Sequence, residues 1–461
     1  MTKNRERDLS NSIKDGAAYS VAAGAGESYI APFAVTAGAS PSFIASLTSL
    51  PALAGALVQL IIPRALHAFP NRKNLVLAAV AINALSWLGI AATVFLAPEA
   101  GLPLLLAFFT VYAASNAFAN TIWSSWMAAL VPLELRGKFF GDRNAITQLV
   151  ALVSTLVAGF ALGLNPETTL TFAFLFVVSF AARTTSLLYL KKISDPAAAV
   201  PPRSEGPIAF LRNPANSDTR PAILGISLYL LVVLIAAPFF VVYQFRVLGF
   251  GYLEYTLLLI VASLARVAGM PYWGRVTNRL GNKPVLTTVA FFAVLTPFAW
   301  LATGNLFLLI LLEVASGFIW AGFDLAIFNY LISATTQDRV PGVMANYNFY
   351  LNAARFAGPL LGASLIASTT ILGQEGVSAA LMGSGLLRIP AAFILLVALK
   401  ENRILVPRRG APAIITIDAA HPTRALTRQV HYVGNALGKF TVAGARLVRK
   451  SSYALKNRIR R

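Results

Sequence analysis

The sequence predicts an all-α membrane protein, with twelve transmembrane helices in two six-helix bundles related by pseudo-twofold symmetry and a C-terminal amphipathic helix. The composition is 57% hydrophobic and only 12% charged, about half the charge of an ordinary soluble protein. Twelve apolar stretches each approach the ~20 residues that cross a bilayer. Nearly all Lys and Arg lie in alternate loops between these stretches, which is typical of a multi-pass membrane protein.

Each apolar stretch is expected to be a helix, because backbone polar groups cannot stay unpaired in lipid. The runs are too long and too continuous for the alternating strands of a β-barrel. The twelve spans are predicted at 15–37, 41–62, 74–97, 102–131, 144–164, 169–190, 221–244, 253–272, 284–303, 305–333, 343–367 and 377–399.

The positive charges predict the orientation. Of the 38 Lys and Arg, all but five lie in loops on the side of the N-terminus or in the two terminal segments. Arg246 lies in a loop on the other side, and the remaining four lie within spans: Arg183, Arg266, Arg355 and Arg388. Because loop cations stay in the cytoplasm during insertion, both termini are expected to be cytoplasmic. The first fourteen residues lack the apolar core of a signal peptide, and we expect a multi-pass protein of a bacterial inner (plasma) membrane.

The composition also excludes several kinds of site. The chain has no Cys, which excludes disulfides and thiolate chemistry. Its three His, His67, His421 and His431, do not stand at metal-ligand spacing. No nucleotide-binding glycine loop is present. We therefore expect no metal, no cofactor, no enzymatic activity and a monomeric chain.

The net charge of +20 is concentrated in the tail, where residues 400–461 hold 14 Lys or Arg against Glu401 and Asp418. The anionic inner leaflet is a nearer partner for this tail than nucleic acid. Apolar residues recur at mostly helical spacing over 426–459, which predicts an amphipathic helix on anionic lipids. A solvated tail without a regulatory role is the alternative.

The chain divides into a first bundle at 1–192, a polar cytoplasmic linker at 193–220, a second bundle at 221–400 and the tail at 401–461. The two bundles share weak repeats. Ala31-Pro32-Phe33 in the first span corresponds to Ala237-Pro238-Phe239 in the seventh, and Arg183 and Arg388 stand 205 residues apart in the sixth and twelfth spans. These matches indicate a duplicated six-helix unit, as in one large class of transporters.

The loop after the eighth span, GRVTNRLGNKPVL at 274–286, follows the pattern G-x-x-x-D-R-x-G-R-[KR], with Asn278 in place of the Asp. The loop after the second span keeps the basic residues, with His67 at the acidic position. These loops and the 126–143 connection resemble the major facilitator superfamily over about residues 1–400. The resemblance implies alternating access of two rocking bundles, with spans one, four, seven and ten lining the cavity. The fifth span lacks most of the glycine pattern of the family's antiporters, which argues against a drug antiporter.

Basic side chains in these loops can pair with helix C-terminal carbonyls or an acid in one state and release them in the other. The alternative is that the loops only set the topology. The predicted gating residues are Arg64, Arg72, Lys73, Gly274, Asn278, Arg279, Gly281 and Lys283.

Three acids lie within the predicted spans, where a charge costs roughly 2.5–3.5 kcal/mol at the bilayer centre. Glu27 lies mid-span between two nearby glycines and Pro32, where it can bind and release a proton as access alternates. Glu313 and Asp324 are eleven residues apart, about three turns, and so share one face of the tenth span with Trp320. The alternative for each acid is a packed, interhelical hydrogen bond.

Two polar stripes complete the candidate site. The fourth span carries Tyr112, Asn116, Asn120 and Trp123 at helical spacing, which suits recognition of hydroxyl or amide groups. The eleventh span carries Asn348, Asn352 and Arg355, and Arg355 is a candidate partner of Asp324 or of an anionic substrate. Amide bonding between helices explains such stripes equally well. Arg183 and Arg388 are expected to be structural, because the family places the sixth and twelfth spans peripherally.

The sequence therefore favours a secondary transporter of a small organic solute that uses protons. Two alternatives stay open: a membrane receptor or scaffold that acts through the basic tail, and a lipid flippase of the same fold.

Overall fold

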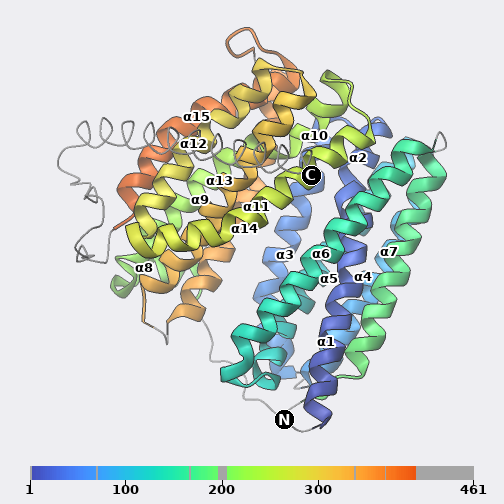
Figure 1. Cartoon of the computed structure of the whole chain (residues 1–461), viewed down its shortest axis with the longest axis vertical. Helices are drawn as coiled ribbons and strands as arrows, with labels where there is room; N and C mark the ends of the chain where they lie inside the picture. The colour runs from blue at the N-terminus through green and yellow to red at the C-terminus, as the bar shows by residue number, and fades with distance from the viewer. Residues whose placement is uncertain are drawn as a thin grey trace, which may run out of the picture. The chain divides into compact units, whose positions relative to one another are not determined.

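The computed structural model describes residues 3–68, 71–165, 168–195, 205–336, 339–368 and 370–400. These residues are almost entirely helical, and they form the twelve spans in two bundles that the sequence predicts (Figure 1). The first span combines α1 (Lys3–Ala22), a π-helical segment (Ala23–Glu27) and α2 (Ser28–Thr36). The rest of the first bundle comprises α3 (Pro41–Ala68), α4 (Arg72–Thr93), α5 (Pro98–Leu130), α6 (Leu133–Leu164) and α7 (Thr168–Lys191).

The second bundle begins after two short helices, α8 (Pro207–Arg212) and a 3₁₀ turn (Pro214–Asn216), which lie in the predicted linker. Its first span is broken into α9 (Thr219–Ala236), a 3₁₀ turn (Ala237–Phe239), α10 (Phe240–Val242) and a π-helical segment (Tyr243–Val247). The remaining spans are α11 (Tyr252–Leu280), α12 (Asn282–Ala302), α13 (Leu306–Ser333), α14 (Val340–Ser368) and α15 (Gly376–Ala398).

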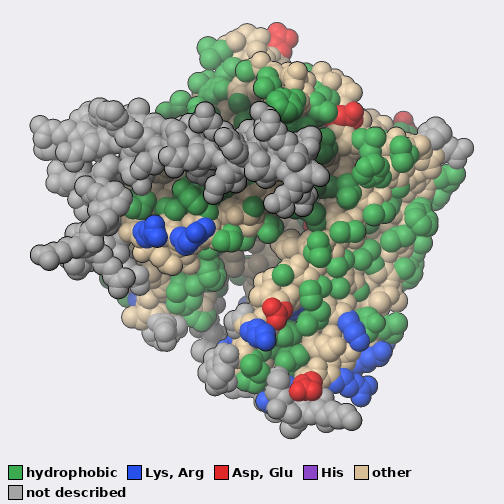
Figure 2. Space-filling model, viewed as in Figure 1, with side chains coloured by type: hydrophobic (Ala, Val, Ile, Leu, Met, Phe, Trp, Pro, Cys, Tyr) green, Lys and Arg blue, Asp and Glu red, His purple; other side chains and the backbone are tan. Residues whose placement is uncertain are grey.

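The spans form a multi-pass integral membrane protein. Ten of the described helical stretches are long and apolar enough to cross a bilayer. The other two spans are the interrupted first one and α14, which carries Asn346, Asn352 and Arg355. Exposed apolar side chains cover the outer flanks, as Leu149, Val153, Val157 and Phe160 do along α6. Figure 2 shows such side chains over the first bundle, with Lys and Arg gathered toward the end where α1 begins. We call this side the N-terminal face.

Several helices extend beyond the apolar stretches that predicted them. α6 begins at Leu133 rather than near 144, and α11 continues to Leu280 rather than ending near 272. Gly274, Asn278 and Arg279 consequently lie on the last turns of a helix, not in a loop. The helix ends at Gly281, whose φ of +91° favours glycine. Hydropathy detects where side chains leave lipid, whereas a helix ends where its backbone can be capped.

The first span is irregular at its centre. Gly24 packs against the backbone of α6, where a Cβ atom would overlap Ala151 O, and Gly26 packs against Trp87 and Ser179. The absence of a side chain at these two glycines therefore allows the first span to approach its neighbours closely. Both glycines belong to the five-residue π-helical segment Ala23–Glu27. Such single-turn insertions are frequent at functional sites.

The two bundles contact each other at the face opposite the N-terminal face. Arg246 donates hydrogen bonds from Nη2 to Val35 O (3.0 Å) and Ala39 O (2.7 Å). The Tyr29 and Thr256 hydroxyls are hydrogen-bonded at 2.8 Å, and Tyr255 donates to Ser28 O at 2.9 Å. The largest apolar core includes residues of both bundles on this side. On the N-terminal face the described surface is hollowed between the bundles (Figure 2).

The predicted tail helix and its lipid contacts lie outside the described residues, which end at Lys400.

Candidate functional site

Glu27 lies at the centre of the first bundle, at the end of the π-helical segment. Its carboxylate accepts a hydrogen bond from the hydroxyl of Tyr112 on α5, at 2.9 Å. Tyr112 is buried and packs against Trp87 and Phe109, with ring centroids 4.9 and 5.7 Å apart. Glu27 itself is exposed, and its carboxylate is directed toward the buried Tyr112 of the same bundle.

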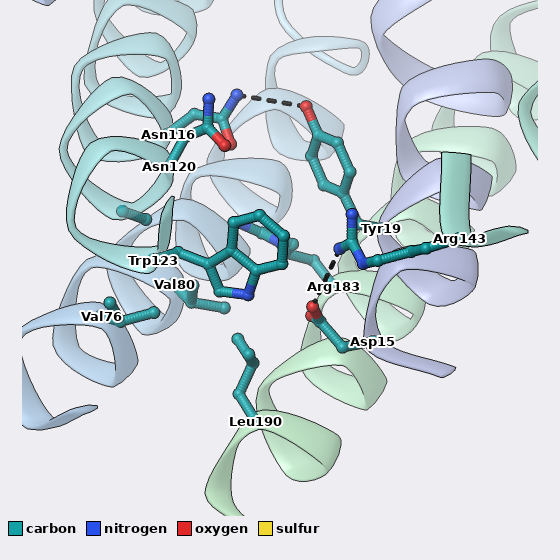
Figure 3. A pocket seen from close by; sticks show the side chains of 11 residues that line it. Asp15, Tyr19, Val76, Val80, Asn116, Asn120, Trp123, Arg143, Arg183 and Leu190 are labelled. Carbon is teal, nitrogen blue, oxygen red and sulfur yellow. Dashed lines mark hydrogen bonds and ion pairs between the residues drawn. The ribbon is translucent and has the colours of Figure 1, made fainter. Parts of the chain in front are cut away.

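A cavity of about 180 Å³ opens inside the same bundle, among α1, α4, α5, α6 and α7 (Figure 3). Three of the four residues of the predicted stripe on α5 line it: Asn116, Asn120 and Trp123. The other lining residues are Asp15, Tyr19, Val76, Val80, Ala119, Arg143, Arg183 and Leu190. The structure thus joins the predicted amide and aromatic groups to charged groups from three further helices.

The charged groups of this cavity form one hydrogen-bonded network. Arg143 on α6 pairs with Asp15 on α1 at 3.4 Å. Asp15 also accepts a hydrogen bond from Ser186 Oγ at 2.6 Å, and Ser186 in turn accepts one from Arg183 Nη1 at 3.1 Å. Arg183 Nε donates to Asn83 Oδ1 at 2.7 Å. The network links α1, α4, α6 and α7 through buried polar side chains.

Both guanidinium groups also lie over aromatic rings. Arg143 lies over Trp123, 4.3 Å from the ring centroid, and Arg183 lies over Tyr19 at 4.7 Å. Asn116 donates from Nδ2 to the Tyr19 hydroxyl at 3.2 Å, as Figure 3 shows. These cation–π contacts hold the two cations at the cavity wall and limit their motion.

The second bundle contributes a more open group. Asp324 on α13 forms an ion pair with Arg266 on α11, and each side chain is 45% exposed. The suggested partnership of Asp324 with Arg355 is therefore replaced by one with Arg266. Arg355 is exposed and lies 3.5 Å from Asn352 Oδ1. Tyr347 on α14 lies within electrostatic range of both Arg355 and Asp324.

The remaining residues of the predicted site lie farther along these helices. Glu313 accepts a hydrogen bond from Trp300 Nε1 on α12 at 3.1 Å. Trp320 packs on Phe323, with ring centroids 5.2 Å apart. Asn348 is exposed on α14. Glu313 and Asp324 therefore bind different neighbouring helices although they share a face of α13.

The predicted gating residues lie on the N-terminal face, where three of them form the following hydrogen bonds, none of which crosses between the bundles. Arg72 donates to Ser125 O at 3.4 Å, and Lys283 Nζ donates to Leu399 O at 2.6 Å. The backbone of Lys73 donates to Asp195 at 3.4 Å. Arg64, Asn278 and Arg279 are exposed. In this conformation Lys283 serves as a C-terminal cap of α15.

Arg183 was expected to be structural in a peripheral span; it bonds Asn83 and Ser186, and its side chain also lines the cavity inside the first bundle. Asp15, Tyr19 and Arg143 were not among the residues predicted from the sequence. Asp15 stands at the edge of the predicted first span and Arg143 just before the fifth, so both resembled ordinary boundary charges. An available signal was the position of Asp15 and Tyr19 four residues apart on one helix face.

Twelve spans in two bundles, with charged groups held inside them, define an integral membrane transporter. The family model of the Major Facilitator Superfamily matches residues 17–363. The chain belongs to this superfamily and is a secondary transporter. No curated protein matches the sequence.

Several solved transporters share the fold. A mutant form of the nucleoside transporter NupG is 14% identical, with a TM-score of 0.65, and the match covers 86% of this chain and 100% of that one. A D-xylose–proton symporter is 16% identical, with a TM-score of 0.62 and coverage of 86% and 97%. The human organic anion transporter MFSD10 is 14% identical, with a TM-score of 0.60 and coverage of 85% and 99%.

Proposed function

We propose that the chain is a proton-coupled transporter of a small organic solute in a bacterial inner membrane, with both termini in the cytoplasm. The observation that carries this proposal is the position of Glu27. Its carboxylate is exposed about halfway along the first span, beside an irregular helical turn, and accepts a hydrogen bond from Tyr112. A carboxylate that meets each side of the membrane in turn can carry a proton across it.

We infer that the solute path runs between the bundles and that acids and polar stripes of both bundles contribute to it. Asp324 and Arg355 offer a second titratable group and a cation from the second bundle. Asn116, Asn120 and Trp123 line the cavity of the first bundle, and we propose that Trp320, Asn348 and Asn352 contribute from the second bundle. A few convergent amides and aromatic rings in an apolar setting suit a small polar solute.

The contacts between the bundles support alternating access. They gather at the face opposite the N-terminus, through Arg246, Tyr29 and Tyr255. With the N-terminus in the cytoplasm, this conformation is open to the cytoplasm. In the other state we expect the basic residues around Arg72 and Arg279 to latch the cytoplasmic face closed.

The test is solute uptake by purified protein in liposomes under an imposed pH gradient. The first solutes are D-xylose, nucleosides and organic anions, which the names of the structural neighbours suggest. Glu27→Gln is expected to abolish gradient-driven accumulation while exchange of solute continues. Glu99→Gln is the matched control, because Glu99 is exposed at the start of α5 and lies far from the site. Undiminished accumulation in Glu27→Gln refutes coupling through this residue.

A further inference from the structure

Arg183 is a buried cation that has no role in the proposed proton coupling. It is 5% exposed and lines the cavity of the first bundle. A guanidinium has five N–H donors. Those on Nε and Nη1 bond Asn83 and Ser186, whereas Nη2 has no hydrogen-bond partner among the described residues. A cation buried this deeply requires a negative or strongly polar partner.

The lining of the cavity carries more positive than negative charge. Arg143 and Arg183 are its cations, and Asp15 is its one acid. α4 contributes the apolar Val76 and Val80, and α5 contributes amides and Trp123, so these two helices add no charge to the lining. Tyr19 is the remaining titratable group, on the same helix as Asp15.

One further acid lies near the cavity without lining it. Glu27 stands within electrostatic range of Arg183 and is held by Tyr112. A proton on Glu27 removes the second negative charge that Arg183 faces. The excess cation of the lining is then no longer offset by Glu27, and its attraction offsets part of the desolvation cost of an entering anionic group.

We propose that this cavity binds the anionic group of the transported solute, a carboxylate or a phosphate, through Arg183 and Arg143. This inference rests on the proposed transport function and names its substrate class. A guanidinium fork matches the geometry of either oxyanion. Asn116 and Asn120 supply hydrogen bonds beside it. The volume of about 180 Å³ is that of roughly six water molecules, enough for an oxyanion and a few further atoms.

The second bundle shows what a purely structural arginine looks like at the same position of the repeat. Arg388 is 2% exposed and donates to Ala293 O (2.8 Å), Val233 O (3.5 Å) and Ser384 Oγ (3.3 Å). All three of its nitrogens have partners, two of them backbone carbonyls. Arg183 instead faces a cavity with an unused Nη2.

Asp15 competes with the solute for the same cations. It takes the Arg143 ion pair and the Ser186 hydroxyl, and its charge repels an entering oxyanion. Asp15→Asn keeps the shape of the side chain and removes this repulsion, so it is expected to tighten anion binding. A residue with only a structural role would not change affinity in that direction.

The test is binding to the purified full chain by calorimetry in a neutral detergent at neutral pH, with ligands up to about 10 mM. The probes are matched pairs: benzoate with benzamide, gluconate with glucose, and glycerol 3-phosphate with glycerol. We expect at least one anion to bind and its neutral partner not to bind. Arg183→Gln is expected to weaken that binding at least tenfold, and Asp15→Asn to tighten it about tenfold. Arg275→Gln removes an exposed cation outside the cavity and is expected to leave affinity unchanged.

Arg183→Lys covers the case in which the glutamine variant does not fold, because it keeps the charge and loses the fork. It is expected to bind the anion several-fold more weakly. The proposal is overturned if none of the three anions binds, if neutral partners bind equally well, or if Asp15→Asn weakens binding. Anion binding without any flux contradicts the proposed transport function but supports the proposed anion site. Proton-driven uptake of a neutral solute that does not need Arg183 supports the transport function but contradicts the anion site.

Discussion

Asp324 and Arg266 form an ion pair whose side chains are each 45% exposed, so water screens most of their attraction. Such pairs contribute about 0–1 kcal/mol to stability. We therefore predict that Asp324→Asn lowers the free energy of unfolding by less than about 1 kcal/mol, yet impairs solute accumulation. Thermal melts and liposome uptake measure the two effects. The control is Asp218→Asn, which breaks the similarly exposed pair with Lys400 and is expected to leave uptake intact. Equal uptake in both variants argues against a role of Asp324 in transport.

Arg388 illustrates the opposite case, a buried cation whose removal costs stability. Its loss removes the Arg388 donor from Ala293 O, whereas Val233 O keeps the backbone N–H of Ala237. An unsatisfied buried group costs about 1–3 kcal/mol. Arg388→Gln is predicted to lower the unfolding free energy by about that amount in denaturation experiments. Anion binding by the folded fraction should stay at the wild-type level. A loss of binding affinity without a loss of stability contradicts the structural role.

Some residues of the candidate site could be predicted individually from spacing, and others could not. Asn116, Asn120 and Trp123 share a helix face, and the structure places all three on one cavity wall. Arg183 was not predicted to line a cavity, because the family assigns its span to the periphery. Its side chain reaches inward from α7 to Asn83 on α4, and residue spacing along α7 alone does not predict such a contact.

At the scale of the element, the π-helical segment of the first span depends on glycine. A Cβ at Gly26 would meet Trp87 and Ser179, which are buried on α4 and α7. Gly26→Ala is predicted to destabilise the chain by about 1–3 kcal/mol through overpacking. Gly141→Ala is the matched control, because nothing lies within 4 Å of its Cβ position, and it should be neutral or stabilising by up to ~1 kcal/mol. Thermal melts of the two variants should therefore move apart, and identical melts refute the packing argument.

Helix existence followed from hydropathy, whereas helix ends did not. α6 and α11 continue beyond the apolar residues because charged side chains at the bilayer surface are compatible with a helical backbone. The consequence is functional. Arg143 lies inside α6 rather than in a loop, and only this places its guanidinium over Trp123 and beside Asp15.

At the scale of the whole molecule, twelve spans, two bundles and the repeat were all readable in the sequence. The charged network was not, because its members meet only after folding. Asp15 bonds Ser186, 171 residues away, and pairs with Arg143, 128 residues away. Pairings between residues so far apart cannot be predicted from a single sequence. The face at which the bundles touch was equally hidden, since it depends on small residues such as Gly159 that resemble any other glycine of a span.

Gly159 supplies the sharpest test of alternating access. A Cβ at this position of α6 would overlap the side chain of Thr256 on α11, the same residue that bonds Tyr29 across the two bundles. Gly159→Ala should therefore hinder closure of the opposite face and favour the state in which the N-terminal face is closed. An overpacking cost of about 1–3 kcal/mol corresponds to a shift of about 5- to 150-fold in a two-state equilibrium.

The measurement is the distance between spin labels at Ala128→Cys on α5 and Arg275→Cys on α11, both on the N-terminal face. The labels are specific because the chain has no other Cys. Gly159→Ala is predicted to shift the distance distribution toward shorter values, whereas Gly141→Ala on the same helix should leave it unchanged. A shift toward shorter distances in Gly159→Ala would indicate that the two bundles switch together between two states. An unaltered distribution in Gly159→Ala means that Thr256 yields locally, and the contact at this face does not then control which side of the membrane the cavity meets.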